Sequence, residues 1–116
     1  LQSLARPLLR AGLNVIVDAA ALRRCERDDL RALAAAEGAR FVLVECTAPE
    51  AVLRKRIARR MAAGHDASDA TPEVLDFQLG IREPVAMDEA ARSMPTDCDA
   101  ATLAARCEAL AETLRQ

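Results

Sequence analysis

The apolar positions of this chain alternate between two spacings. Residues 1–11 and 21–37 carry leucines and alanines at helical spacing, and each stretch is followed by a glycine, which commonly ends a helix. Residues 13–18 and 41–46 are instead short apolar runs rich in β-branched side chains, which predict strands buried on both faces of a parallel sheet. Strand, helix and strand joined by short links predict a right-handed parallel crossover unit.

The middle of the chain predicts a third helix with a polar loop after it. This helix should begin after Thr47 to Glu50, which have capping-box spacing, and should run to about Ala63 before Gly64. Its apolar stripe is expected at three positions: Leu53, Ile57 and Met61. Residues 64–70 form the polar loop, and Thr71 begins another helix that should end near Gly80.

The last third of the chain predicts one more strand and a closing helix. Residues 81–91 are ambiguous, because Pro84 forbids an uninterrupted helix through them. Residues 93–97 are compatible with a short edge strand, where Pro95 is tolerated. The closing helix should start at Asp99 or Ala100 and present one apolar face: Leu103, Cys107, Leu110 and Leu114.

Composition limits the core and the classes of partner. The 116 residues fit one domain over residues 1–116, and only Phe41 and Phe77 are aromatic, so we expect a thin core. The net charge of −2 gives no general attraction to nucleic acid or to an anionic membrane. No segment has the length and apolarity of a transmembrane helix or forms a signal peptide, so a cytoplasmic location is predicted.

The four cysteines do not form a metal motif. No CxxC pair is present, and the chain has a single histidine, which disfavours a zinc site. Buried, reduced thiols are the favoured interpretation for all four: Cys25, Cys46, Cys98 and Cys107.

Asp18 is the first candidate for chemistry. It ends the first predicted strand, and ligands bind at the carboxyl ends of strands in open α/β sheets. A carboxylate there can hold Mg²⁺ or accept a proton from an attacking hydroxyl. The alternative, which stays open, is that Asp18 only caps the next helix or turns the chain.

A group of arginines on the third predicted helix is the second candidate: Arg54, Arg56, Arg59 and Arg60. Arg56 and Arg60 are four apart and therefore neighbours on one face, where a polyphosphate would accept charge-assisted hydrogen bonds. A solvated helix face explains the same pattern. The loop at 64–70 fits either a hinged lid or an ordinary solvent loop, and its His65 either a general base or an exposed side chain. Arg27 fits either surface charge or a ligand contact.

These pieces occur in a familiar order. Val15-Ile16-Val17-Asp18-Ala19-Ala20 comes first, then Glu26-Arg27, then Phe41-Val42-Leu43-Val44-Glu45-Cys46, then Pro49 to Arg60, then Asp66-Ala67-Ser68-Asp69-Ala70. Over residues 8–83 the chain resembles the predicted-kinase group of small P-loop kinases, which are AAA-family ATPase-like and related to polynucleotide kinases. The resemblance implies an α/β, three-layer P-loop NTPase-like fold with a mainly parallel sheet and flanking helices.

The resemblance also implies roles for single residues. Asp18 resembles the acid that contributes to Mg²⁺ binding or to phosphoryl transfer, and Arg56 and Arg60 resemble the lid pair that reaches the phosphates of ATP. Arg27 matches an arginine that follows the acidic strand, a cofactor contact whose role is less defined. Ser68 and Asp69 match the end of the lid, which would span about residues 54–71. ATP and Mg²⁺ are therefore the expected cofactors, and an aminoglycoside-phosphotransferase-like domain, often fused to such kinases, is a candidate partner.

One motif of these kinases is absent. They bind phosphate with Gly-x-x-x-x-Gly-Lys-Ser/Thr, but no two glycines here have that spacing, and the single lysine, Lys55, lies inside a predicted helix. The chain is therefore expected to be an N-terminally incomplete domain, inactive alone, from an ATP-dependent phosphotransferase with a hydroxyl acceptor. The alternative is a non-catalytic α/β binding or assembly module. A nucleic-acid end kinase is disfavoured by the charge balance and the few aromatic residues.

Overall fold

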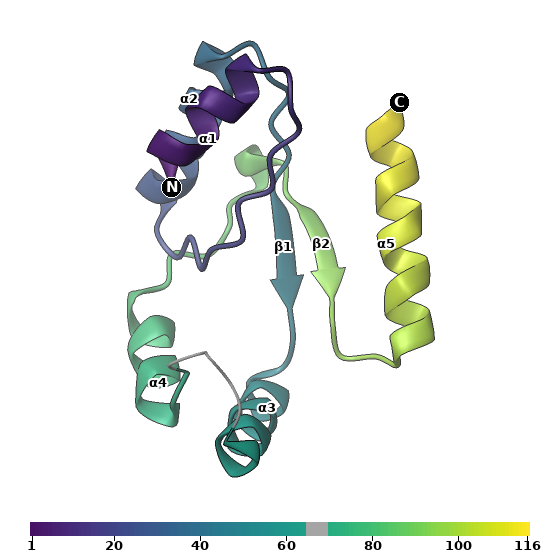
Figure 1. The fold of residues 1–116 in the computed structure, drawn as a ribbon. Coiled ribbons are helices and arrows are strands. Elements are labelled where there is room, and N and C mark those ends of the chain that lie inside the picture. Colours follow the sequence, from purple (N-terminus) through teal and green to yellow (C-terminus); the bar gives the residue numbers. More distant parts are fainter. Residues whose placement is uncertain (65–69) are drawn as a thin grey trace. The chain divides into compact units, whose positions relative to one another are not determined.

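The chain divides into two compact units, each described here by itself. The computed structural model describes residues 1–64 and 70–116. The first unit comprises Leu1–Leu43 and Asp76–Ala90, and the second comprises Val44–Leu75 and Ala91–Gln116. In chain order the helices and strands are α1 (Gln2–Arg10), α2 (Arg24–Ala36), β1 (Val44–Thr47), α3 (Glu50–Ala63), α4 (Pro72–Ile81), a 3₁₀ turn η1 (Met87–Glu89), β2 (Arg92–Pro95) and α5 (Ala100–Arg115) (Figure 1).

The first unit is built on α1 and α2, which pack side by side (Figure 1). Both helices lie close to their predicted ranges, and both are followed by glycines with positive φ, 78° at Gly12 and 66° at Gly38. Arg6 and Arg10 of α1 both donate to the carboxylate of Glu37, the residue that ends α2. The buried apolar residues of this unit are small in number: Ala5, Leu33 and Ala34.

Residues 13–18 do not form the strand that their apolar pattern predicts. They have no regular secondary structure and no strand pairing, and Ile16 is 94% exposed. A β-branched run becomes a strand only when a neighbouring strand satisfies its backbone N–H and C=O groups. Among the described residues, no strand pairs with this run, so the predicted crossover from 13–18 to 41–46 is wrong.

The second unit contains the sheet, which has two strands in the described part of the chain. β1 and β2 are parallel, with Val44 opposite Arg92 and Thr47 opposite Pro95 (Figure 1). The predicted edge strand at 93–97 therefore exists, shifted by one or two residues, and the strand predicted at 41–46 lies at Val44–Thr47. The result is a small α/β structure with a parallel sheet; the three-layer architecture stays a prediction.

The start and the packing of α3 differ in detail from the sequence prediction. Pro49 occupies the N-cap position without a side-chain cap, so the capping box from Thr47 does not form. Thr47 is instead the last residue of β1, where its carbonyl accepts from Thr96. Ile57 is buried at 8% exposure, but Met61 is 57% exposed and does not belong to the buried stripe. Gly64 ends the helix in the left-handed conformation, as predicted.

α5 begins at the predicted position. Asp99 is its N-cap, and its Oδ1 accepts from the backbone N–H of Thr102 at 2.7 Å. Leu103, Leu110 and Leu114 are half-buried, whereas Cys107 is exposed. The expectation of buried thiols is wrong: all four cysteines are free, three are exposed, and Cys98 is half-buried. On α5, small neighbouring side chains leave too little bulk to cover the Cys107 thiol.

In the described ranges 1–64 and 70–116, no helix combines the length and the apolar character that crossing a membrane requires.

Candidate functional site

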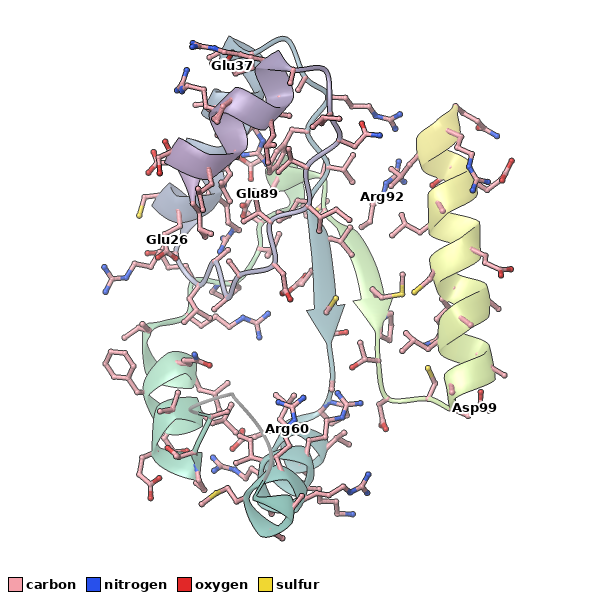
Figure 2. All side chains as sticks on the ribbon, viewed as in Figure 1. Glu26, Glu37, Arg60, Glu89, Arg92 and Asp99 are labelled. Atoms are coloured by element: carbon pink, nitrogen blue, oxygen red, sulfur yellow. The ribbon has the colours of Figure 1, made fainter. Side chains whose placement is uncertain are left out.

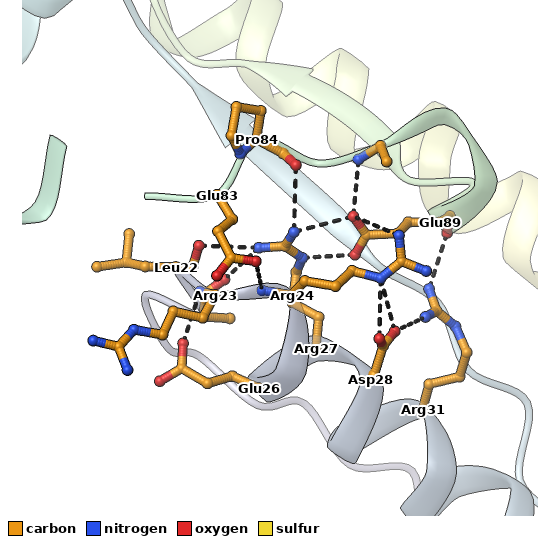
Figure 3. Close-up of polar contacts among 12 residues, drawn as sticks. Leu22, Arg23, Arg24, Glu26, Arg27, Asp28, Arg31, Glu83, Pro84 and Glu89 are labelled. Carbon is orange, nitrogen blue, oxygen red and sulfur yellow. Dashed lines mark hydrogen bonds and ion pairs between the residues drawn. The ribbon is translucent and has the colours of Figure 1, made fainter. Parts of the chain in front are cut away.

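Arg27 lies in the first full turn of α2 and is 2% exposed. Its Nε donates to Glu89 Oε1 at 2.6 Å and its Nη2 to Glu89 Oε2 at 3.0 Å, which makes a bidentate pair (Figure 3). Nη1 donates to the carbonyls of Ala21 and Leu22, and Nη2 also to the carbonyl of Pro84 at 3.5 Å. The interpretation of Arg27 as surface charge is therefore wrong, and its guanidinium is bound by its own chain.

Glu89 is the acidic partner, at the end of η1, and its side chain is fully covered. Besides Arg27, its Oε2 accepts from the backbone N–H of Ala86 at 2.8 Å. The hydrogen bond from Arg27, the bond from Ala86 and the nearby positive charges lower the pKa of Glu89 to about 2. The same pair raises the pKa of Arg27. Both groups are thus held in their charged forms.

A ring of more exposed charges surrounds this pair (Figure 3). The Arg24 guanidinium contacts both Asp28, one turn along α2, and Asp88, which precedes Glu89. Arg31 donates to Asp28 and to the carbonyl of Glu89. Because of the hydrogen bonds from Arg24, the pKa of Asp88 is lowered. These exposed pairs add little stability individually, but they keep residues 83–89 against the N-terminal turns of α2.

Two alanines beside the pair have unusual backbone conformations. In the described part of the chain, Ala21 (φ 42°) and Ala90 (φ 51°) are the non-glycine residues with positive φ. For a residue with a Cβ, this conformation costs about 1–2 kcal/mol. The carbonyl of Ala21 accepts a hydrogen bond from Arg27, and Ala90 directly follows Glu89. The buried pair therefore sits between two strained turns.

Asp18 belongs to the same unit and lies three residues before Ala21, in the segment of residues 13–22, which has no regular secondary structure. Its side chain is exposed. Within residues 1–64 and 70–116, no group of three or more His, Cys, Asp or Glu side chains is placed so that it could hold a metal ion. A Mg²⁺ ion is commonly held by one or two carboxylates with water and substrate phosphates, so Asp18 remains a suitable ligand in principle.

The α3 arginines belong to the second unit and have different partners. Arg56 is half-buried and donates from Nη1 to Thr96 Oγ1 at 2.9 Å and from Nη2 to the Thr96 carbonyl at 2.8 Å. Arg54 pairs with Glu50 one turn earlier. Arg60, one turn beyond Arg56, is exposed near the end of α3 (Figure 2). His65, Ser68 and Asp69 lie outside the described residues.

Glu89 is the residue that sequence reasoning missed. It lies in the ambiguous stretch 81–91, where no periodicity marked it as buried. A signal did exist for Arg27, which is three residues before Leu30 and seven before the buried Ala34, and therefore on the covered side of α2. A charged residue at such a position requires a buried partner of opposite charge.

Comparison with known proteins decides the family. A family model described as an AAA domain matches residues 1–85, well over half of the chain. The chain belongs to the AAA domain family. Searches of curated proteins and of solved structures gave no match. The match supports a P-loop NTPase or kinase-like family, and so nucleotide binding, with Mg²⁺ in general use among such proteins, as the function at a coarse level.

The residues of this AAA domain chain fit part of a nucleotide site. Arg60 is an exposed cation on a helix, and Arg56 lies one turn away, so α3 can contact phosphate oxygens. The cradle of backbone amides that usually holds the β- and γ-phosphates has no counterpart in the sequence. Among the candidate residues, the arginines of α3 are chemically suited to binding phosphate oxygens.

Proposed function

We propose that this chain is part of an ATP-dependent phosphotransferase that transfers the γ-phosphoryl group of Mg-ATP to a hydroxyl acceptor. The AAA domain match over residues 1–85 carries the proposal, because it spans all four candidate residues: Asp18, Arg27, Arg56 and Arg60. Phosphoryl transfer requires positioning and neutralisation of charge rather than covalent chemistry by the protein. Arginines and a carboxylate are suited to both tasks.

Three of the candidates have separate tasks in this proposal. Arg60 binds phosphate oxygens directly, since its side chain extends from an exposed position on α3. Arg56 anchors α3 to Thr96 and reaches the phosphates only by giving up one of these two hydrogen bonds. Asp18 holds Mg²⁺ or accepts the proton of the attacking hydroxyl. When bound, Mg²⁺ would offset the negative charge that develops on the phosphates.

Full-length protein titrated with Mg-ATP tests the proposal, together with turnover measured on a panel of small hydroxyl compounds. We expect Arg60→Ala to lower turnover at least about tenfold, which corresponds to about 1.4 kcal/mol of transition-state stabilisation. Its thermal midpoint should remain that of the wild type. Arg59→Ala is the matched control, because Arg59 is adjacent and exposed but is not in the proposed pair.

Two outcomes contradict the proposal. Wild-type turnover in Arg60→Ala would remove the α3 arginines from the reaction. No binding of Mg-ATP by the full-length protein would leave a non-catalytic α/β binding or assembly module, the alternative function, which predicts no nucleotide affinity at all.

A further inference from the structure

The strained residues Ala21 and Ala90 are connected through a single pair of side chains. Arg27 Nη1 donates to the carbonyl of Ala21 at 3.0 Å, and Arg27 also forms the bidentate pair with Glu89, the neighbour of Ala90. Strained backbone persists only where the surrounding structure determines it, and it clusters at functional sites. In this unit, the Arg27–Glu89 pair is the buried structure that adjoins both turns.

The pair also joins two segments that are far apart in sequence. The first is the Asp18 segment, residues 13–22, and the second is the connection after α4, residues 82–90. Glu83 donates its backbone N–H to the Leu22 carbonyl at 2.8 Å, and its carboxylate accepts from the backbone N–H of Arg24 at 3.0 Å. Figure 3 shows the Arg27 guanidinium between these segments, with Leu22 on one side, Glu89 on the other and the Pro84 carbonyl above it.

All the donors of Arg27 are used in this arrangement. An arginine has five N–H groups, one on Nε and two on each terminal nitrogen. Nε donates to Glu89, Nη1 to Ala21 and Leu22, and Nη2 to Glu89 and Pro84. No donor of Arg27 is left for a phosphate oxygen, and the side chain is 3% exposed. Its effect on a reaction has to pass through the segments that it holds.

We propose that Arg27 and Glu89 form a positioning pair that fixes the end of the Asp18 segment and thereby places the Asp18 carboxylate. The Asp18 segment is not held by strand pairing in the described structure. Its last residues are held by the backbone bond from Glu83 to Leu22 and by the side-chain contacts of Arg27. Arg27 donates to the carbonyls of the strained residue Ala21 and of Leu22 after it, and Glu89 holds the Arg27 guanidinium in place. The role given to Asp18 rests on the proposed phosphotransferase function, whereas the structural coupling does not.

Positioning and direct nucleotide binding by Arg27 predict different kinetics. If Arg27 contacted ATP, removing Arg27 would raise the KM or Kd for ATP, whereas removing its partner Glu89 would not. A positioning pair instead lowers kcat in both single variants, because the reacting carboxylate is displaced after ATP has bound. The two changes are also non-additive, since each one breaks the same interaction.

The experiment uses the full-length protein with Glu89→Gln, Arg27→Lys and the double variant. Glu89→Gln keeps the shape of the side chain but removes its charge, and Arg27→Lys keeps the charge but loses the planar fork. We expect faster hydrogen exchange in every variant at the backbone N–H of Glu83, which is bonded to Leu22 at the end of the Asp18 segment. We also expect kcat to fall at least about tenfold and KM for ATP to change less than about threefold. The kcat of the double variant should be no lower than that of the less active single variant.

Asp88→Asn is the matched control, because Asp88 is the adjacent carboxylate but lies exposed and forms its ion pair with the outer Arg24. It should leave hydrogen exchange at the Glu83 N–H and kcat at wild-type values. Unchanged exchange at the Glu83 N–H in Glu89→Gln overturns the proposal, whether or not the protein is an enzyme. If Glu89→Gln does not fold, unchanged exchange in Arg27→Lys has the same meaning.

The kinetic outcomes separate this proposal from the proposed function. Faster exchange with unaltered kcat would show that the pair does not act through Asp18. A Kd for ATP that is raised in Arg27→Lys but not in Glu89→Gln would identify a direct contact between Arg27 and ATP. Either result overturns the positioning role. Absence of phosphotransfer by the wild type refutes the phosphotransferase proposal, and the exchange measurement then still decides whether Glu89 fixes the Asp18 segment.

Discussion

The guanidinium of Arg56 donates to both the hydroxyl and the backbone carbonyl of Thr96, at 2.9 and 2.8 Å. Thr96 in turn donates its backbone N–H to the Thr47 carbonyl at 2.7 Å, directly beyond the paired strands β1 and β2. Arg56 therefore connects α3 to the end of the sheet. The helical spacing of Arg56 and Arg60 suggested that Arg56 contacts phosphates. In the structure, Arg56 also holds α3 against the end of the sheet within the second unit.

Arg56→Ala should lower the free energy of unfolding by about 1–2 kcal/mol, because two hydrogen bonds from a charged donor are lost. Arg59→Ala, on the same helix but exposed, should change it by less than about 0.5 kcal/mol. Urea unfolding of both variants measures the difference. Equal stabilities would mean that the Arg56–Thr96 contact contributes nothing in solution.

Ile57→Ala should destabilise the protein by about 2–4 kcal/mol, because it removes buried methyl groups and leaves a cavity. Met61→Ala, one turn later, should cost less than about 0.5 kcal/mol, since 57% of Met61 is already exposed to solvent. Thermal or urea unfolding of the two variants tests the orientation of α3. A large loss in Met61→Ala would instead support the stripe that the sequence pattern predicts.

Protonation of Glu89 should weaken the fold at low pH. Its pKa falls from 4.5 to about 2 in the folded protein, so its stabilising contribution is complete above the unfolded pKa and is lost as the pH falls toward the folded one. The wild type should therefore be more stable than Glu89→Gln at neutral pH, and this difference should shrink between about pH 5 and pH 2.

Urea unfolding at a series of pH values measures this dependence. Glu37, Asp88 and Asp99 also have lowered pKa values, so some acid sensitivity should remain in Glu89→Gln. Glu108→Gln, on the exposed surface of α5, is the control and should keep the wild-type profile. A difference between wild type and Glu89→Gln that does not change with pH would show that Glu89 has an ordinary pKa.

Ala90→Gly should not destabilise the protein, although glycine usually does. Removing the Cβ relieves a left-handed conformation that costs about 1–2 kcal/mol, which offsets the about 0.5–1 kcal/mol of added chain entropy in the unfolded state. Ala32→Gly, at an exposed position inside α2, should cost about 1 kcal/mol. Comparison of their thermal midpoints is the test, and a loss in Ala90→Gly as large as that in Ala32→Gly would contradict the strain.

The helices of this protein were predictable from the sequence because their signals are local. Glycines at positions 12, 38 and 64 follow α1, α2 and α3, and Asp99 caps α5, as the pattern indicates. Each signal acts over one helical turn, so no knowledge of distant residues is needed. The arginine helix α3, which carries half of the candidate site, was found in this way.

The strands were predicted less well, because pairing is not local. Residues 13–18 and 41–46 have similar apolar patterns, but only Val44–Thr47 of the second has a hydrogen-bonded neighbour in the described structure. The apolar pattern shows that a run is able to form a strand, and a partner elsewhere in the chain decides whether it does.

By itself, the sequence determined the helices and where they end, the arginines of α3, the absence of a phosphate-binding motif within residues 1–116, and the kinase-like resemblance that the AAA domain match supports at a coarse level. Only the tertiary structure decided that Arg27 is buried, that Glu89 is its partner, and that Arg56 is held by Thr96. These contacts join residues that are distant along the chain, and burial of a charge depends on which segments fold over it.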